Sequence, residues 1–183
     1  MIRRVTLLLV LLLMGITPGW AVESGLESIR ISPAGVPDDI EAILEKLESR
    51  TGFISASWDT SLGAFMVAVE DSIRFQPSHL KQELEATGLE VETFRLEFKS
   101  AKGVIRKEKT GSEGYIVSGA NDMEFPVLFN VNSQRLWYFL GRTPHGRGVP
   151  LNMSCVVHFG APDSNGVFAP DTVSVVRFRV ANR

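Results

Sequence analysis

Residues 37–58 read PDDIEAILEKLESRTGFISASW and predict a helix, its end and the strand that follows. Pro37 suits the first turn of a helix, where its missing N–H is not needed. The acidic residues after it favour the positive end of the helix dipole, and Gly52 is a residue type that ends helices. The apolar residues between them recur at the spacing of one helix face: Ile40, Ile43, Leu44 and Leu47.

Strand patterns and a second helix surround this segment. Asp59 to Gly63 has the composition of a hairpin turn, Gln76-Pro77 begins a second helix and Gly88 ends it. The expected strands cover residues 26–31, 53–58, 64–69 and 89–98, with a bend near Thr93. The order β-α-β-β-α-β predicts a ferredoxin-like domain, in which two helices cover one face of a four-stranded antiparallel sheet.

Several local features of this domain are shared with a known family. They are the loop before the first helix, the Ile-x-x-x-Leu run within it, the Gly52-Phe53-Ile54 stretch after it and Gly88-Leu89-Glu90-Val91 after the second helix. In these features residues 26–98 resemble the heavy-metal-associated domain family of copper chaperones and transport-ATPase amino-terminal modules. The resemblance implies the ferredoxin-like fold of that family.

The metal site of the family is a Cys-x-x-Cys pair preceded by a Met, because soft ions such as Cu(I) and Zn(II) select thiolates. Alignment on Ile40 places Pro33 and Val36 at the Cys positions and Ile31 at the Met position. None of these side chains binds a soft ion, so the resemblance implies the fold without its metal site. A ferredoxin-like domain with no metal-binding ancestry is an equal alternative, since this fold carries many functions.

The second half of the chain has a different pattern. Helical periodicity disappears from Ser100 onward, and five or six apolar stretches are separated by turn residues. We therefore expect a small all-β domain over residues 101–183, either an OB-like barrel or a sandwich, after a first domain at 22–100. The expected strands are 102–109, 114–118, 124–131, 135–140, 151–159 and 173–180.

The first residues predict export. Arg3 and Arg4 precede an apolar run, and Gly19 and Ala21 suit a signal peptidase site, so residues 1–21 are expected to be a cleaved signal peptide. The alternative is an uncleaved anchor, but the run is shorter than the ~20 residues of a membrane span. Cleavage predicts a periplasmic or extracellular protein without a stable membrane anchor.

Charge and cysteine content narrow the function. Without Arg3 and Arg4, 17 of the 19 basic residues remain against 21 acidic ones, a net charge of −4. A nucleic-acid-binding protein is expected to be basic, so no nucleic acid partner is predicted. One cysteine, Cys155, allows no internal disulfide, and packing must supply the stability.

Residues 153–158 hold the only cluster of soft metal ligands, Met153, Cys155 and His158. Met and Cys suit Cu(I), and Zn is the other candidate. In a strand Met153 and Cys155 point to one side and His158 to the other. Since the shared face also carries apolar residues, core packing is the favoured interpretation and metal ligation the alternative.

Two further places are candidate partner-binding sites. Tyr138 lies in the expected strand 135–140, where it is the aromatic residue that could face a partner. Arg142, His145 and Arg147 lie in a basic, glycine-rich loop of the kind that binds anions. The alternative for this loop is a flexible connection whose glycines serve turns.

The motifs of common enzyme classes are missing from the sequence: no nucleophile elbow, zinc-protease helix or phosphate-binding loop is present. We therefore predict no catalytic residues, no cofactor and no enzyme activity. The predicted function is an exported, non-catalytic binding or accessory protein with a protein partner in the cell envelope. The alternative is Cu(I) or Zn binding or trafficking through Met153, Cys155 and His158.

Overall fold

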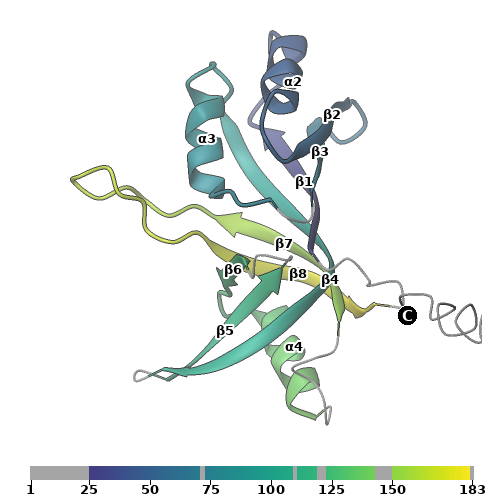
Figure 1. Cartoon of the computed structure of the whole chain (residues 1–183), viewed down its shortest axis with the longest axis vertical. Helices are drawn as coiled ribbons and strands as arrows, with labels where there is room; N and C mark the ends of the chain where they lie inside the picture. The colour runs from purple at the N-terminus through teal and green to yellow at the C-terminus, as the bar shows by residue number, and fades with distance from the viewer. Residues whose placement is uncertain (1–24, 71–72, 109–110, 119–122, 143–149, 182–183) are drawn as a thin grey trace, which may run out of the picture.

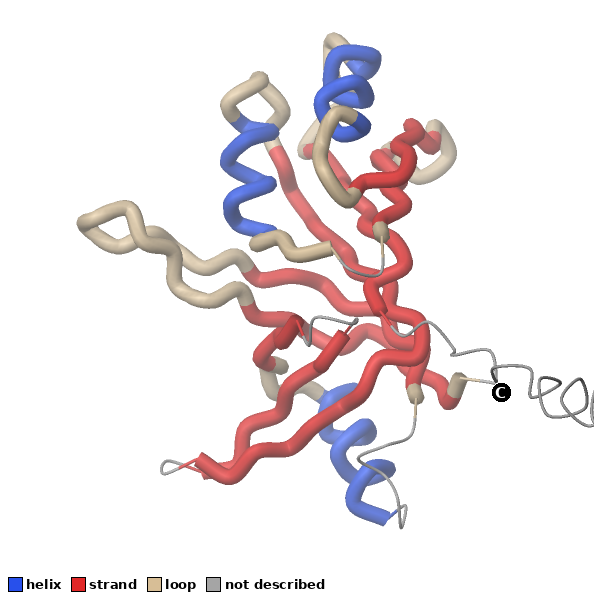
Figure 2. The backbone as a smooth tube through the Cα atoms, in the orientation of Figure 1, coloured by secondary structure: helices blue, strands red, loops and turns tan. Residues whose placement is uncertain are grey.

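The computed structural model describes residues 25–70, 73–108, 111–118, 123–142 and 150–181. Within these ranges eight strands form one antiparallel sheet, and three helices pack on it (Figures 1 and 2). The predicted signal peptide lies outside the described residues. In chain order the elements are β1 (Gly25–Pro33), α2 (Ile40–Glu48), β2 (Phe53–Asp59), β3 (Ala64–Val69), α3 (Pro77–Glu85), β4 (Val91–Glu108), β5 (Gly111–Ser118), β6 (Met123–Pro126), α4 (Val131–Arg142), β7 (Leu151–His158) and β8 (Thr172–Val180).

The elements predicted for residues 26–98 are confirmed in their order. The first four strands pair antiparallel in the order β2-β3-β1-β4. Helix α2 begins after Asp39, whose Oδ1 accepts a hydrogen bond from the Ala42 N–H at 2.9 Å. Gly52 after this helix has φ 85°, a conformation that glycine adopts without strain. None of the described helices is long and apolar enough to cross a membrane.

One face of the sheet forms the hydrophobic core. Ile29, Val67 and Leu96 lie side by side on β1, β3 and β4, and all three are fully buried. Residues of α2 and α3 belong to the same core, among them Leu47 and Leu84. Burying these aliphatic side chains stabilises the fold by about 1.5–3 kcal/mol each.

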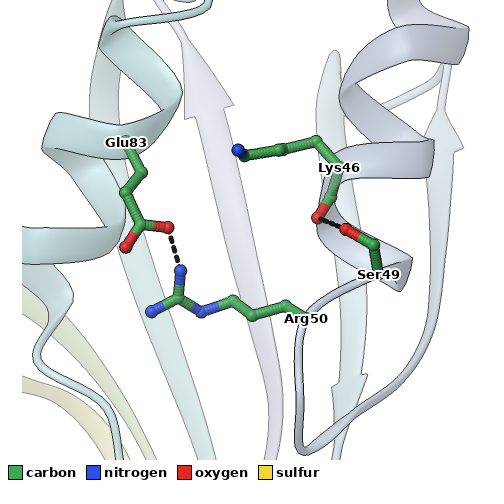
Figure 3. A network of polar contacts seen from close by, with 4 residues as sticks. All are labelled: Lys46, Ser49, Arg50 and Glu83. Carbon is green, nitrogen blue, oxygen red and sulfur yellow. Dashed lines mark hydrogen bonds and ion pairs between the residues drawn. The ribbon is translucent and has the colours of Figure 1, made fainter.

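A polar contact links the two helical segments. Arg50, just after α2, forms an ion pair with Glu83 on α3 (Figure 3). The Ser49 Oγ donates to the Lys46 carbonyl oxygen at 2.9 Å and satisfies one of the carbonyl groups at the end of α2. The Arg50–Glu83 ion pair therefore links the end of α2 to the surface of α3, in addition to the core that the two helices share.

Strand β4 belongs to both halves of the sheet. Its first part pairs with β1 on one edge and with β7 on the other, and its last part pairs with β5. The register between β1 and β4 skips Glu92, a bulge next to the predicted bend at Thr93. Ser100 has φ 55°. The predicted domain boundary near residue 101 lies inside this strand, and the division into two domains stays a prediction.

The second half corrects two expectations. The segment 135–140, predicted as a strand, lies within helix α4, so this half is not all-β. The described strands also do not close into an OB-like barrel, because no ladder joins β6 to β8. Val127, the residue after β6, forms only an isolated bridge with Val173 of β8. The helix forms because Asn130 and Ser133 cap it reciprocally, with the Ser133 N–H donating to Asn130 Oδ1 and the Asn130 N–H to Ser133 Oγ, both at 2.7 Å.

Two kinds of contact position helix α4 on the sheet: the packing of Trp137 against glycines of β4 and β5, and hydrogen bonds from asparagine side chains to β8. Trp137 lies against Gly114 of β5 and near Gly103 of β4, where no side chain stands in its way. The Asn130 and Asn132 amides donate to backbone carbonyls of β8, those of Val175 at 3.2 Å and Val176 at 2.9 Å. These contacts hold α4 beside the edge of β8 (Figure 1).

Candidate functional site

The face of the sheet opposite the core carries a row of polar side chains. On β1 the residues that alternate with the core are Ser28 and Arg30, and on β4 they are Arg95 and Glu97. The row continues on β7 and β8, because Glu97 lies opposite Ser154, which in turn lies opposite Arg177. Four strands that are distant in sequence therefore build one charged surface.

A groove of about 480 Å³ runs over this surface. Its volume lies within the roughly 300–1,000 Å³ range of small-molecule sites. Its charged lining residues are Glu27, Arg30, Glu97, Arg177 and Arg179, and its uncharged polar ones include Ser28, Asn152 and Ser154. The groove is therefore a candidate binding site with a surplus of positive charge.

Two arginines are cross-strand neighbours on this face, and the first of them, Arg30, lines the groove. Arg30 on β1 and Arg95 on β4 occupy directly opposite positions in the antiparallel register. Both Nε atoms are buried, and neither has a hydrogen-bond partner in the described part of the chain. Burial lowers the pKa of Arg95, the positive charge of Arg30 lowers it further, Glu97 acts in the opposite direction and Arg177 adds to the lowering. Like charges directly opposite each other destabilise a sheet.

Glu97 is engaged by other neighbours. Its Oε1 accepts a hydrogen bond from Ser154 Oγ at 2.7 Å, and its Oε2 lies 3.6 Å from the Arg177 Nη2. Among the described residues, no carboxylate is within ion-pair distance of the Arg30 or Arg95 guanidinium. The arrangement can therefore accept a negatively charged group beside these two arginines.

The structure separates the three predicted metal ligands. Met153 and Cys155 are buried on the core face of β7, whereas His158 is exposed and its Nε2 lies 2.7 Å from Ser174 Oγ. Burial raises the pKa of the Cys155 thiol, and the charge of Glu97 adds to this effect. The described residues hold no cluster of three His, Cys, Asp or Glu side chains suited to a metal ion. Metal binding by these residues stays a prediction.

Two of the predicted partner-binding residues, Tyr138 and Arg142, lie on helix α4. Tyr138 is 58% exposed on α4, and the Arg142 guanidinium carbon lies 4.2 Å from the centre of its ring. His145 and Arg147 lie outside the described residues. A role for these residues in binding a partner stays a prediction.

The arginine surface on the polar face of the sheet was not predicted from the sequence. Its signal is present in the strands, since SIRIS (28–32), FRLEF (94–98) and VVRFRV (175–180) each place arginine among alternating apolar residues. Such a position usually holds a solvated side chain. Only the pairing of the strands shows that three of these arginines converge.

No protein-family model matches the chain, and neither the curated proteins nor the solved structures include a significant match to it.

Proposed function

We propose that this chain is an exported, non-catalytic binding or accessory protein whose binding site is the groove on the polar face of the sheet. The observation that carries the proposal is the convergence of Arg30, Arg95 and Arg177 beside a groove of ligand size. Open faces of antiparallel sheets are commonly solvated. A solvated face has no need of two opposed arginines with buried, unpartnered Nε atoms, whereas a ligand site does.

The proposal includes the architecture of the first half. We assign residues 25–98 to a ferredoxin-like domain, similar to the heavy-metal-associated family but without its metal-binding loop. The antiparallel strand order β2-β3-β1-β4 and the two intervening helices support this assignment. The loop before α2 carries Pro33 and Val36 in place of cysteines, and Val36 is 78% exposed. We therefore place binding on the sheet face and not at this loop.

The proposal also includes export. Residues 1–21 would be removed by signal peptidase, and residues 22–183 would act in the periplasm or outside the cell. Purification of the chain from an exporting host, followed by mass measurement, tests this step. A mass that begins at Val22 supports export with cleavage, and an intact Met1 in the membrane fraction contradicts it.

A thermal-shift screen tests the groove itself. The exported protein and a Ser28→Trp variant are compared against a library of anionic, neutral and cationic metabolites. Ser28 lines the groove, and a tryptophan on this strand would fill part of it. We expect at least one compound to raise the melting temperature of the wild type and not of the variant. Compounds that stabilise both proteins equally, or none that stabilise either, would contradict the proposal, and so would chemical turnover of a bound compound.

A further inference from the structure

We propose that Arg30, which lines the sheet-face groove, and Arg95, its cross-strand neighbour beside the groove, form a subsite for a doubly charged oxyanion, a phosphate or sulfate group, carried by a small ligand. The inference rests on the proposed function, because it names the chemistry of the ligand that the groove would bind. It specifies both the charge of the ligand and the residues that recognise that charge.

The Nε atoms of Arg30 and Arg95 lack hydrogen-bond partners in the described part of the chain. A buried polar atom without a partner costs about 1–3 kcal/mol in a folded protein, and both Nε atoms are in this state. An oxyanion offers several acceptors at once, and the planar guanidinium matches its geometry with two parallel hydrogen bonds. One group bound beside the two guanidinium groups would offer acceptors to both side chains, and each side chain would turn to bring its buried Nε within reach of the anion.

The balance of charge also favours an oxyanion. Glu97 lies 3.6 Å from Arg177, and its negative charge also acts on Arg95. Glu27 and Arg179, the other charged lining residues, are both exposed and opposite in sign. Three arginines, Arg30, Arg95 and Arg177, against the one carboxylate of Glu97 leave a net charge of +2, and no carboxylate in the described part of the chain lies within ion-pair distance of Arg30 or Arg95. A dianion matches this charge, and a single carboxylate matches half of it.

The size of the groove indicates a ligand larger than the oxyanion alone. The groove of about 480 Å³ exceeds what one phosphate needs and suits a small organic molecule. Met66, which is half-buried on β3, contributes apolar surface to its lining. The oxyanion would thus be the charged end of a larger molecule whose remainder lies along the strands.

Titration with simple anions tests the subsite. The exported protein is titrated by calorimetry at constant ionic strength with inorganic phosphate, sulfate and acetate. We expect phosphate and sulfate to bind once per chain and acetate to bind at least about tenfold more weakly. Arg30→Gln and Arg95→Gln should each weaken phosphate binding by about tenfold or more, because a hydrogen bond to a charged group is worth one to two powers of ten in affinity.

Two controls separate binding from folding. Arg135→Gln removes an exposed arginine of α4 that does not line the groove and should leave phosphate binding unchanged. Without anion, Arg30→Gln should melt no lower than the wild type, because it removes a like-charged neighbour of Arg95. Arg30→Lys keeps the charge but not the planar fork, and we expect intermediate affinity.

The outcomes are distinct. Wild-type affinity in both glutamine variants, or an equal loss in Arg135→Gln, would overturn the subsite. If the metabolite screen yields groove ligands that are neutral or cationic while phosphate and sulfate fail to bind, the proposed function stands and the oxyanion subsite is wrong. If phosphate binds with the expected loss in both arginine variants, the subsite is supported.

Discussion

Trp137 of α4 occupies the space that any side chain at residue 114 would need. A Cβ atom placed on Gly114 would lie 2.0 Å from the Trp137 Cζ2, well inside the sum of the atomic radii. Gly114 lies on β5, opposite Ile105 of β4. The close approach of helix and sheet at this point therefore depends on the missing side chain.

Replacement of this glycine should loosen the second half of the fold. We expect Gly114→Ala to lower the free energy of unfolding by about 1–3 kcal/mol, as other overpacked sites do. Urea denaturation followed by tryptophan fluorescence measures the change. Gly141→Ala is the matched control, because a Cβ there meets nothing within 4 Å and alanine favours the helix by up to about 1 kcal/mol. Equal stability of Gly114→Ala and the wild type would contradict the packing described here.

Asp171 should stabilise α3 from a distant part of the chain. This buried carboxylate accepts hydrogen bonds from the Ser78 N–H at 2.9 Å and the Gly160 N–H at 2.8 Å. Asp171→Ala would leave both donors without that partner, and we expect a loss of about 2 kcal/mol in the free energy of unfolding. Asp163 accepts two backbone N–H groups in an exposed loop, so Asp163→Ala should cost less than about 1 kcal/mol. Similar losses in the two variants would show that burial does not matter at Asp171.

Cys155 should be unreactive in the folded protein. Its thiol is fully buried, and burial raises its pKa. We expect labelling by an aromatic disulfide reagent at pH 8 only after denaturation. Rapid labelling of the native protein would contradict this prediction and would favour the metal-binding alternative, which needs an accessible thiolate.

The same thiol predicts how stability varies at alkaline pH. The folded pKa lies above the unfolded value of about 8.5. The contribution of the thiol to stability is therefore complete below about pH 8.5 and is lost as the pH rises toward the folded pKa. Between pH 8 and 10 the wild type should lose more stability than Cys155→Ala. Parallel curves for the two proteins would contradict the raised pKa.

The Arg50–Glu83 ion pair should contribute little. Its side chains are 27% and 44% exposed, so water and salt screen their attraction. A double-mutant cycle with Arg50→Ala and Glu83→Ala should give a coupling of about 0.2–1 kcal/mol that shrinks in 1 M salt. The cycle is needed because Arg50 also lies over the Phe53 ring, 5.7 Å from its centre, and this packing would inflate a single substitution. A coupling that is independent of salt would show that the pair is less solvated than its exposure indicates.

Local signals explain which parts of the fold could be predicted. The apolar spacing and the closing glycine of helix α2 lie within a few residues of each other, and the helix forms as predicted except at its start. It begins at Ile40, after the Asp39 cap, and not at Pro37. Helix α4 was missed because RLWYFL (135–140) is a short apolar run that fits either period, and periodicity alone cannot separate a strand from a helix there. Asn130 and Ser133 form a capping pair at the start of α4. This spacing of Asn and Ser is a local signal for a helix start that the prediction of a strand left out.

The candidate site could not be predicted from the sequence for a different reason. Arg30 and Arg95 are neighbours only because β1 pairs with β4 in one register, and a shift by one residue would turn either side chain to the opposite face. Sequence patterns predict which residues of a strand share a face. They do not predict which strands lie side by side, and the groove depends on that second property.

The amides of Asn130 and Asn132 have a consequence for the behaviour of the protein at high concentration. These amides donate to the carbonyls of Val175 and Val176 on β8, a strand of nine residues whose ladder partner is β7. An incoming strand from a second molecule would have to displace both side chains before it could add to the sheet. By occupying these acceptors, α4 protects this edge from the strand-to-strand association through which exposed sheet edges begin to aggregate.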